Sequence, residues 1–276
     1  MASQENTLQK ALEGDINAFQ SLFAEYQDAL KSYLFRLLAS RADADDLTHD
    51  TFIKAFDALS SFKGKSSLKT WTFSIATNLA LNYLKKRQRW TEDVSERAKK
   101  MVLARPDLAA KIENIAQHSP YGQYTIREHI NTCFTCISKN LPIENQIVLI
   151  LKDVYDFSIK EIMMIMTKTE GVVKYLLQNG RKTMTDIFDK RCALINKKGV
   201  CHQCSELNGW FNPKQDQQEA LLQIKLVKAA KKQDKDALYT IRSKLVRAIN
   251  PLKSAGNELQ EILLACNRMA MEGGEI

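Results

Sequence analysis

The segment WTFSIATNLALNYLKKRQRW, residues 71–90, combines side chains that can hold unstacked nucleic acid. Trp71 and Ile75 begin an apolar face with helical spacing, and Asn78 and Asn82 lie on a more polar side. Rings stack on bases, amides read base edges and cations hold phosphates, so the segment predicts a nucleic-acid interface. The alternative is an ordinary surface helix with a packed face and a solvated basic end. The basic residues here and in the preceding loop are Lys63, Lys65, Lys69, Lys85, Lys86, Arg87 and Arg89.

A second group of residues has the spacing of metal ligands. His129, Cys133 and Cys136 form an H-x3-C-x2-C pattern that places them within about 60° of one another on a helix. Zinc prefers four nitrogen or sulfur ligands, and more follow in residues 192–204. Small apolar fillers with surface thiols, or a thiol redox switch, are the alternatives; Cys266, in an apolar helix, is expected in the core. The expected ligands are Cys133, Cys136, Cys201 and Cys204, with His129, Cys192 and His202 as alternatives.

Helical periodicity indicates a first domain over residues 5–88. A second helix begins in SRADADDLTHD, with Asp43 as the expected N-cap and Phe52, Ala55 and Phe56 as its buried stripe. The basic loop and the Trp71 helix follow. The apolar stripe of the first long helix is Phe19, Leu22, Phe23, Tyr26, Leu30, Tyr33, Leu34 and Leu37.

The rest of the chain predicts a linker, a second helical domain and an extension. Residues 89–124 are charged and then polar, and are expected to form a mobile, partly helical linker. Residues 125–190 contain two short helices across the turn MTKT, with helix-turn-helix spacing. Residues 191–276 add a Cys-containing segment and a helical extension. The fold class is therefore all-α. The helices expected here are 158–166, 170–182, about 215–232, 235–249 and 256–271.

Composition limits the class of protein. The 276 residues suffice for two or three domains, and the net charge of +8 indicates a polyanionic partner. The polar start MASQENTLQK carries no secretory signal, and no apolar run reaches the roughly 18 residues of a membrane span. We therefore expect a cytoplasmic protein whose cysteines are thiols or metal ligands. No Gly-rich phosphate loop, nucleophile elbow or H-E-x-x-H motif occurs, so no enzyme activity is expected.

The order of these parts resembles the extracytoplasmic-function (ECF) group of bacterial sigma factors, in the sigma-70 family. DADDLTHDTFIKAF is similar to the segment with which the family binds core RNA polymerase. FKGKSSLKTWTFSIATNLALNYLKKR resembles the reader of the promoter −10 element in sigma region 2, and LPIENQIVLILKDVYDFSIKEIMMIMTKTEGVVKYLLQNGRK resembles the −35 reader in region 4. The resemblance implies a subunit that directs core RNA polymerase to specific promoters and helps to open the −10 region. Promoter DNA, core polymerase and a candidate anti-sigma factor would be its partners, and no cofactor would be required.

The resemblance also assigns roles residue by residue. Polymerase would be bound by Asp45, Asp46, His49, Asp50 and Phe52. The −10 element would be read by Lys63, Lys65, Ser66, Asn78, Tyr83, Lys85, Lys86 and Arg87. The −35 element would be read by Thr169, Glu170, Lys174, Tyr175, Gln178, Asn179 and Arg181, with Glu170 accepting from cytosine N4. Val172, Val173, Leu176 and Leu177 are expected in the core or lining.

The −35 reader departs from the family pattern. Met163 stands where Ala is usual, and Thr167 stands in the turn where Gly is common. Tyr175 and Leu176 replace a common Ser-Arg pair, which removes an expected phosphate contact. The promoter sequence that this helix would read therefore stays open.

The energy of strand opening favours a partner-dependent mechanism. Stacking averages roughly 1.4 kcal/mol per step, so a bubble of about ten steps costs on the order of 14 kcal/mol. Each base stacked on an aromatic ring returns only about 1–3 kcal/mol. A chain that captures a few bases must therefore act on a larger machine.

Other functions remain open at the level of the sequence. A stand-alone helix-turn-helix regulator that senses metal or redox state would use residues 125–190 and would not need the acidic helix or the basic loop. A zinc enzyme would need a general base such as Glu206. The extension could regulate the chain or brace its second domain.

Overall fold

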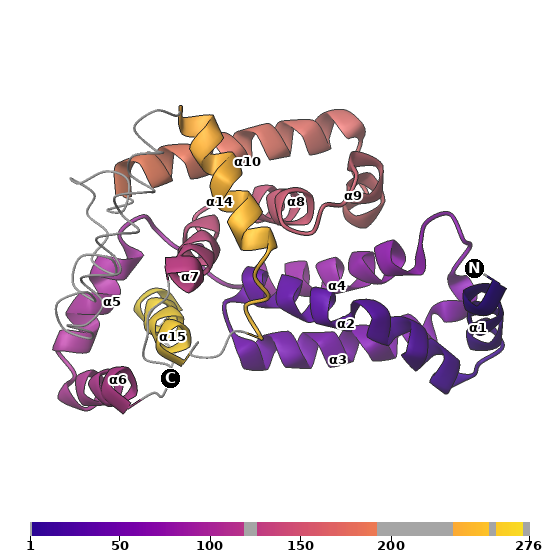
Figure 1. Ribbon diagram of the computed structural model, residues 1–276, viewed down its shortest axis with the longest axis horizontal. Coiled ribbons are helices and arrows are strands. Elements are labelled where there is room, and N and C mark those ends of the chain that lie inside the picture. The colour runs from indigo at the N-terminus through magenta and orange to yellow at the C-terminus, as the bar shows by residue number, and fades with distance from the viewer. Residues whose placement is uncertain (1, 119–125, 192–233, 254–257, 273–276) are drawn as a thin grey trace. The chain divides into compact units, whose positions relative to one another are not determined.

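The computed structural model describes residues 2–118, 126–191, 234–253 and 258–272, and every regular element among them is a helix (Figure 1). The predicted all-α class is therefore confirmed. The chain forms two compact units, one with Met1–Lys86 and Ile147–Leu177, the other with Arg87–Gln146 and Gln178–Ile276. This grouping differs from the consecutive segments 5–88, 89–124, 125–190 and 191–276 expected from the sequence. It arises because residues after α8 pack on the N-terminal helices, while the C-terminal helices pack on the expected linker. None of the described helices is both long enough and apolar enough to cross a membrane.

The first unit begins with a group of antiparallel helices. Helices α2, α3 and α4 lie side by side, and α1 packs on α2 (Figure 1). Phe19 and Phe23 of α2 each lie with their ring centroids 5.2 Å from that of Phe52 on α3. The long apolar stripe predicted for α2 is buried, as expected. The elements are α1 (Ala2–Leu12), α2 (Ile16–Leu38), α3 (Arg41–Asp57), the 3-10 turn η1 (Leu59–Ser61) and α4 (Leu68–Leu84).

Hydroxyl groups fix α4 against α2. The hydroxyls of Tyr26 and Thr72 are 3.0 Å apart, and those of Tyr33 and Thr77 are 2.9 Å apart. All four side chains are buried, so these bonds satisfy groups that would otherwise cost free energy inside the unit. They also fix the rotation of α4 about its axis, which decides which of its faces remains exposed.

Helix starts in this unit are set by side-chain caps. Asp15 Oδ1 accepts from the backbone N–H groups of Asn17 and Ala18 at the start of α2. At the start of α3, Ser40 is extended and its Oγ accepts from the N–H of Asp43 at 3.3 Å. The prediction of Asp43 as the N-cap was therefore wrong by three residues. Asp43 instead lies in the first turn, where its charge favours the helix dipole.

The helix-turn-helix is formed by α8 (Ile143–Asp153), α9 (Ile159–Met166) and α10 (Glu170–Arg191). The two helices expected at 158–166 and 170–182 are confirmed, although α10 extends further, to Arg191. A capping box starts α9, in which Ser158 and Glu161 each bond the backbone of the other. The turn after α9 places Thr167 in the left-handed region, with φ 51°.

Among the described residues, the second unit contains five whole helices, two of them in the expected linker, and the end of α10 from Gln178. Helices α5 and α6 show that the linker is helical, and buried side chains such as Val94 and Leu108 hold it in the unit. Helix α14 packs on α7, and α15 packs on α5, α6 and α7. The predicted extension helices at 235–249 and 256–271 are thus confirmed, whereas 215–232 lies outside the described residues. The helices are α5 (Val94–Leu103), α6 (Pro106–His118), α7 (Ile126–Ser138), α14 (Lys235–Arg247) and α15 (Glu258–Glu272).

Candidate nucleic-acid and protein-binding surfaces

A groove of about 360 Å³ lies between α2 and α3 in the first unit. Of the five residues predicted to bind polymerase, Asp45, His49 and Phe52 line this groove. Asp46 and Asp50 are exposed on the same helix but do not line the groove. The structure therefore brings all five to one helix, with a groove on one side and free carboxylates on the other. The lining residues are Ile16, Gln20, Phe23, Gln27, Lys31, Asp45, Thr48, His49 and Phe52.

The groove offers both charge and apolar surface. Lys31 of α2 forms an ion pair with Asp45 of α3 inside it. Ile16, at its edge, is 48% exposed, and Ile53 on α3 is 43% exposed. Exposed apolar side chains beside an acidic helix face suit a partner helix with apolar anchors and basic flanks. The sequence pattern did not predict that Ile16 and Ile53 would be exposed.

The predicted −10 surface consists of a loop and one face of α4. Lys63 and Lys65 are exposed on either side of Gly64, whose φ of 64° suits glycine. Asn78 is exposed on α4. Ser66 and Tyr83, which are half-buried, and Lys85 and Lys86, which are exposed, complete the part of this set that lies in the first unit.

The buried face of α4 differs from the expectation. Phe73, Ala76 and Ala80 are fully buried, whereas Trp71 and Ile75 are only half-buried. The Trp71 ring packs against Phe62 of the basic loop, with centroids 5.4 Å apart. The hydroxyl bonds to α2 explain this rotation, because they turn Thr72 and Thr77 inwards. Trp71 thus forms a partly exposed aromatic wall beside the loop lysines, a position from which a ring can stack on a base.

Arg87, the last residue of the predicted −10 set, lies in the second unit and is engaged by the C-terminal helix. Its Nη1 donates to Glu272 Oε2 of α15 at 2.5 Å. The sequence pattern did not indicate Glu272, because 185 residues separate the two in the chain. A basic residue expected to hold phosphate therefore holds a carboxylate in this structure.

Arg89, which belongs to the same basic run, has a structural role. Its guanidinium donates to the carbonyl oxygens of Leu141 at 2.8 Å and Ser138 at 3.4 Å, and to Gln146 Oε1 at 2.5 Å. Burial lowers the pKa of Arg89 to about 10, although the nearby Glu272 acts in the opposite direction. Arg89 therefore closes the corner between α7 and α8.

The predicted −35 residues lie along the first turns of α10. Most of the seven are exposed, and Asn179 is half-buried. Glu170 forms a 2.6 Å ion pair with Lys174, one turn along the helix. The hydrogen bond and charge of Lys174 lower the pKa of Glu170, so the carboxylate remains an acceptor. Any base edge that bonds Glu170 must share it with Lys174. The exposed residues are Thr169, Glu170, Lys174, Tyr175, Gln178 and Arg181.

The apolar residues of α10 divide between core and surface. Val173, Leu176 and Leu177 are buried, as expected. Val172, which was expected in the core or lining, is 40% exposed, and Tyr175 is 65% exposed. Val172 therefore lies outside the core, about 60° around α10 from the exposed Tyr175. Exposed apolar groups on a recognition helix can contact thymine methyl groups.

The helix-turn-helix packs directly on α2 and α4 within the first unit. Phe157, in the turn between α8 and α9, lies with its ring centroid 4.8 Å from that of Phe73. The hydroxyl of Tyr155 is 2.7 Å from Ser32 Oγ, and Thr70 Oγ1 donates to Glu161 Oε1 at 3.1 Å. Partial burial raises the pKa of Glu161, but hydrogen bonds from Ser158 and Thr70 outweigh it and lower the value. The two predicted DNA readers therefore touch each other.

The predicted metal ligands are only partly described. Cys133 and Cys136 lie one turn apart on α7 and are buried, and Asn267 Nδ2 donates to Cys136 Sγ at 3.4 Å. The side chain of His129, and Cys192, Cys201, His202 and Cys204, lie outside what the structure describes. Within the described part, no three His, Cys, Asp or Glu side chains form a metal-binding group. Cys266 is 1% exposed in an apolar cluster, which confirms its predicted place in the core.

Comparisons with known proteins match the N-terminal helices most clearly. The family model described as Sigma-70 region 2 matches residues 22–90. The RNA polymerase sigma-H factor of Pseudomonas aeruginosa is 26% identical over 177 residues, which cover 64% of this chain and 89% of that protein. The ECF RNA polymerase sigma-E factor of Haemophilus influenzae is 39% identical over 77 residues, covering 28% of this chain but only 40% of that protein. Among solved structures, CnrH in complex with the cytosolic domain of CnrY is 19% identical with a TM-score of 0.47, and covers 66% of this chain and 95% of that one.

Proposed function

Since the chain belongs to the ECF group of the sigma-70 family, we propose that it directs core RNA polymerase to specific promoters and helps to open the −10 region. One observation carries the proposal. The region 2 match over residues 22–90 coincides with a folded set of helices in which α3 bears exposed carboxylates beside a groove and the basic loop leads into α4. The chain would contribute specificity, and the polymerase would contribute catalysis, so we propose no enzyme activity for this chain.

The acidic face of α3 would bind the polymerase. Asp46 and Asp50 are exposed carboxylates one turn apart, and Phe52 and His49 add a ring and an imidazole at the neighbouring groove. Such a face suits a basic, partly apolar helix of the partner, and long-range attraction between the two would speed their encounter. An anti-sigma factor as a further partner stays a prediction from the sequence.

The face of α4 would capture the opened strand. Lys63 and Lys65 would hold phosphates, Trp71 offers a partly exposed ring, and Asn78 offers an amide for a base edge. These contacts return only a few kcal/mol, roughly 1–3 per stacked base, against a bubble that costs on the order of 14 kcal/mol. The chain alone would therefore bind duplex promoters weakly, and the polymerase would provide the remaining energy.

In vitro transcription tests this function. Core RNA polymerase from the source organism is incubated with the full chain and a random promoter library, and the start sites are sequenced. We expect new, shared start sites only when both proteins are present. A stand-alone regulator would instead bind defined duplexes tightly without polymerase and would create no start site. Absence of both polymerase binding and new initiation would overturn the proposal.

We also propose that Cys133 and Cys136 hold a structural zinc ion. Support comes from their burial one turn apart and from the amide of Asn267, since N–H donors commonly orient metal ligands from outside the first shell. Zinc needs four ligands. The remaining ligands would be Cys201 and Cys204, with His129, Cys192 and His202 as alternatives.

Elemental analysis tests the zinc proposal. We expect about one zinc per folded chain, lost in Cys133→Ser and Cys136→Ser but retained in Cys266→Ser. Cys266 is the matched control because it is a buried cysteine of the same unit that packs in an apolar cluster. A folded wild-type chain without zinc would refute the site.

A further inference from the structure

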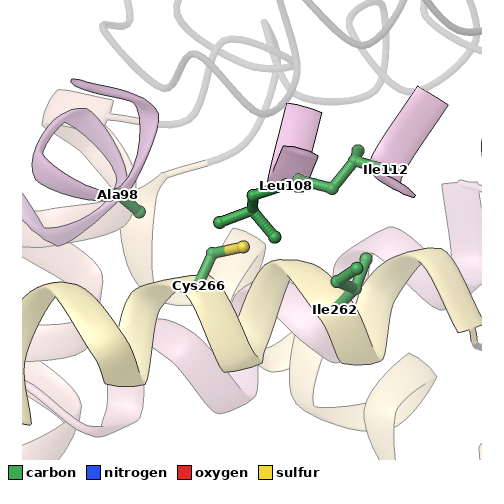
Figure 2. Close-up of a cluster of buried hydrophobic side chains, with 5 residues drawn as sticks. All are labelled: Ala98, Leu108, Ile112, Ile262 and Cys266. Carbon is green, nitrogen blue, oxygen red and sulfur yellow. The ribbon is translucent and has the colours of Figure 1, made fainter. Parts of the chain in front are cut away.

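Helix α15 is fixed to the linker helices by an apolar cluster. Ala98 of α5, Leu108 and Ile112 of α6, and Ile262 and Cys266 of α15 are buried together (Figure 2). The sulfur of Cys266 points toward Leu108 (Figure 2). This packing holds α15 as a rigid element, so the position of its last turn is defined. Partly buried side chains around the cluster are Met101, Val102, Ile115, Leu263 and Ala270.

The last turn of α15 places a carboxylate on the basic tail that follows α4. Glu272 Oε2 lies 2.5 Å from Arg87 Nη1, and the Glu272 side chain is only 14% exposed. In the same turn, Met271 Sδ lies 3.6 Å from Thr91 Oγ1, whose proton is directed to Asp93 Oδ1. Two contacts therefore attach this turn to the segment after α4. The carboxylate is held where the proposed function places a DNA phosphate.

Other cations lie near this ion pair. Lys139 is within electrostatic range of Arg87, Arg89, Arg268 and Glu272. Arg89 also interacts with the charge of Glu272. The cations around this carboxylate outnumber it, so the same position would also attract a DNA phosphate. Packing alone does not require a carboxylate at this position, since the apolar cluster already attaches α15.

We propose that Arg87 is part of a DNA phosphate site that Glu272 occupies in this structure, so that α15 competes with promoter DNA. The proposal rests on the proposed function, because it assumes that the tail after α4 meets DNA. A packed helix holds Glu272 at a high effective concentration beside Arg87. DNA must displace the carboxylate before Arg87 can hold a phosphate, and α15 thereby weakens DNA binding by the free chain.

The test measures binding of a fluorescent single-stranded oligonucleotide to the full chain over a range of salt concentrations, without polymerase. Glu272→Gln keeps the shape of the side chain and removes its charge. We expect affinity to rise about two- to fivefold, because DNA no longer has to displace a charged partner from Arg87. The slope of log affinity against log salt should steepen by about 0.7, because one more phosphate is neutralised.

Two further variants and one stability measurement complete the test. Glu261→Gln removes the same charge elsewhere on α15 and should leave the salt slope unchanged. Arg87→Gln combined with Glu272→Gln should abolish the gain. The thermal unfolding temperature of Glu272→Gln should fall only slightly, because the apolar cluster still attaches α15. An unchanged slope in Glu272→Gln overturns the proposal, as does a lower unfolding temperature without tighter binding, or no binding by any variant at low salt.

Polymerase binding is measured separately on the wild type. If core polymerase ignores the chain, the proposed function fails. The comparison of salt slopes does not depend on polymerase, so the two failures are distinguishable.

Discussion

Lys139 lies directly after α7, and its side chain is almost completely buried. Its ammonium nitrogen is 5.0 Å from the centroid of the Trp90 ring. Burial, with the added effect of the Arg89 charge and against the opposing effect of Glu272, lowers the pKa of Lys139 to about 7. This lysine therefore changes its charge near neutral pH, where an exposed lysine would stay protonated.

This shift predicts that stability increases with pH. The unfolded chain keeps the Lys139 proton up to a pKa of about 10.4, so between about pH 7 and 10 the unfolded state binds more protons. Stability should therefore rise in this window, by up to about 1.4 kcal/mol per pH unit. Lys139→Met should remove this rise in stability with pH. Urea unfolding at pH 7 and 9 should show a gain for the wild type relative to Lys139→Met, and equal gains would show that the lysine titrates normally.

Thr167 is a second residue held in an unfavourable state. Its φ of 51° and ψ of 49° place a β-branched residue in the left-handed region, at a cost of roughly 1–2 kcal/mol. Thr167→Gly removes this strain but loosens the unfolded chain by about 0.4–1 kcal/mol. We expect the free energy of unfolding to rise by about 0.5–1 kcal/mol, measured in urea. Thr167→Ala, which removes only the branch, should show a smaller change, and a less stable glycine variant would contradict the strain.

At the scale of the element, the exposed carboxylates Asp46 and Asp50 of α3 lie apart from the residues of α3 that line the groove. Replacing both Asp46 and Asp50 by Asn removes two exposed charges without touching the groove residues. We expect capture of core polymerase to weaken between about twofold and thirtyfold, since each exposed pair contributes about 0.2–1 kcal/mol. Asp57→Asn, at the other end of α3, is the matched control. Equal polymerase affinity in a binding titration would exclude the carboxylate face from the interface.

If α4 and the α9–α10 pair read the −10 and −35 elements as proposed, we expect the contact between α4 and α9 to break on a promoter. Elements centred about 25 base pairs apart lie about 85 Å apart along straight DNA, at roughly 3.4 Å per pair. In the first unit, by contrast, Thr70 of α4 bonds Glu161 of α9. The two readers must therefore separate before both elements are bound at once.

Distance measurements test this separation. Labels at the exposed positions Asn82 on α4 and Met164 on α9 should move apart when polymerase and promoter DNA are added. Labels at Gln20 and Lys54, both on the α2–α3 pair, should keep their distance. An active promoter complex with an unchanged distance between α4 and α9 would contradict the separation.

For the whole molecule, the local sequence pattern predicted where helices form better than it predicted how they pack. The helix-turn-helix and the two described extension helices follow from apolar spacing and from caps, which act within a few residues. Ser40 and Asp43 are both good caps, so the sequence could not decide between them. The packing of Tyr155 and Phe157 on α2 and α4 could not be predicted, because apolar periodicity does not name the partner of a face.

The candidate surfaces were likewise predicted only where exposure follows from the local sequence. Lys63, Lys65 and Asn78 are exposed as their types and spacing suggest. Arg87 and Arg89 belong to the same basic run, yet one bonds Glu272 and the other bonds backbone carbonyl groups of residues 138 and 141. Only tertiary structure separates them, because charge alone does not tell a solvated cation from one that satisfies buried acceptors.

The three hydrogen bonds of Arg89 also set the length of the connection between α4 and the start of α8. With residue 89 anchored to Leu141 and Gln146, residues 85–88 connect Leu84, the last residue of α4, to this anchor. Four residues reach about 14 Å when fully extended. We therefore expect the range of promoter spacings that the two proposed DNA readers tolerate to depend on whether the guanidinium of Arg89 releases its acceptors.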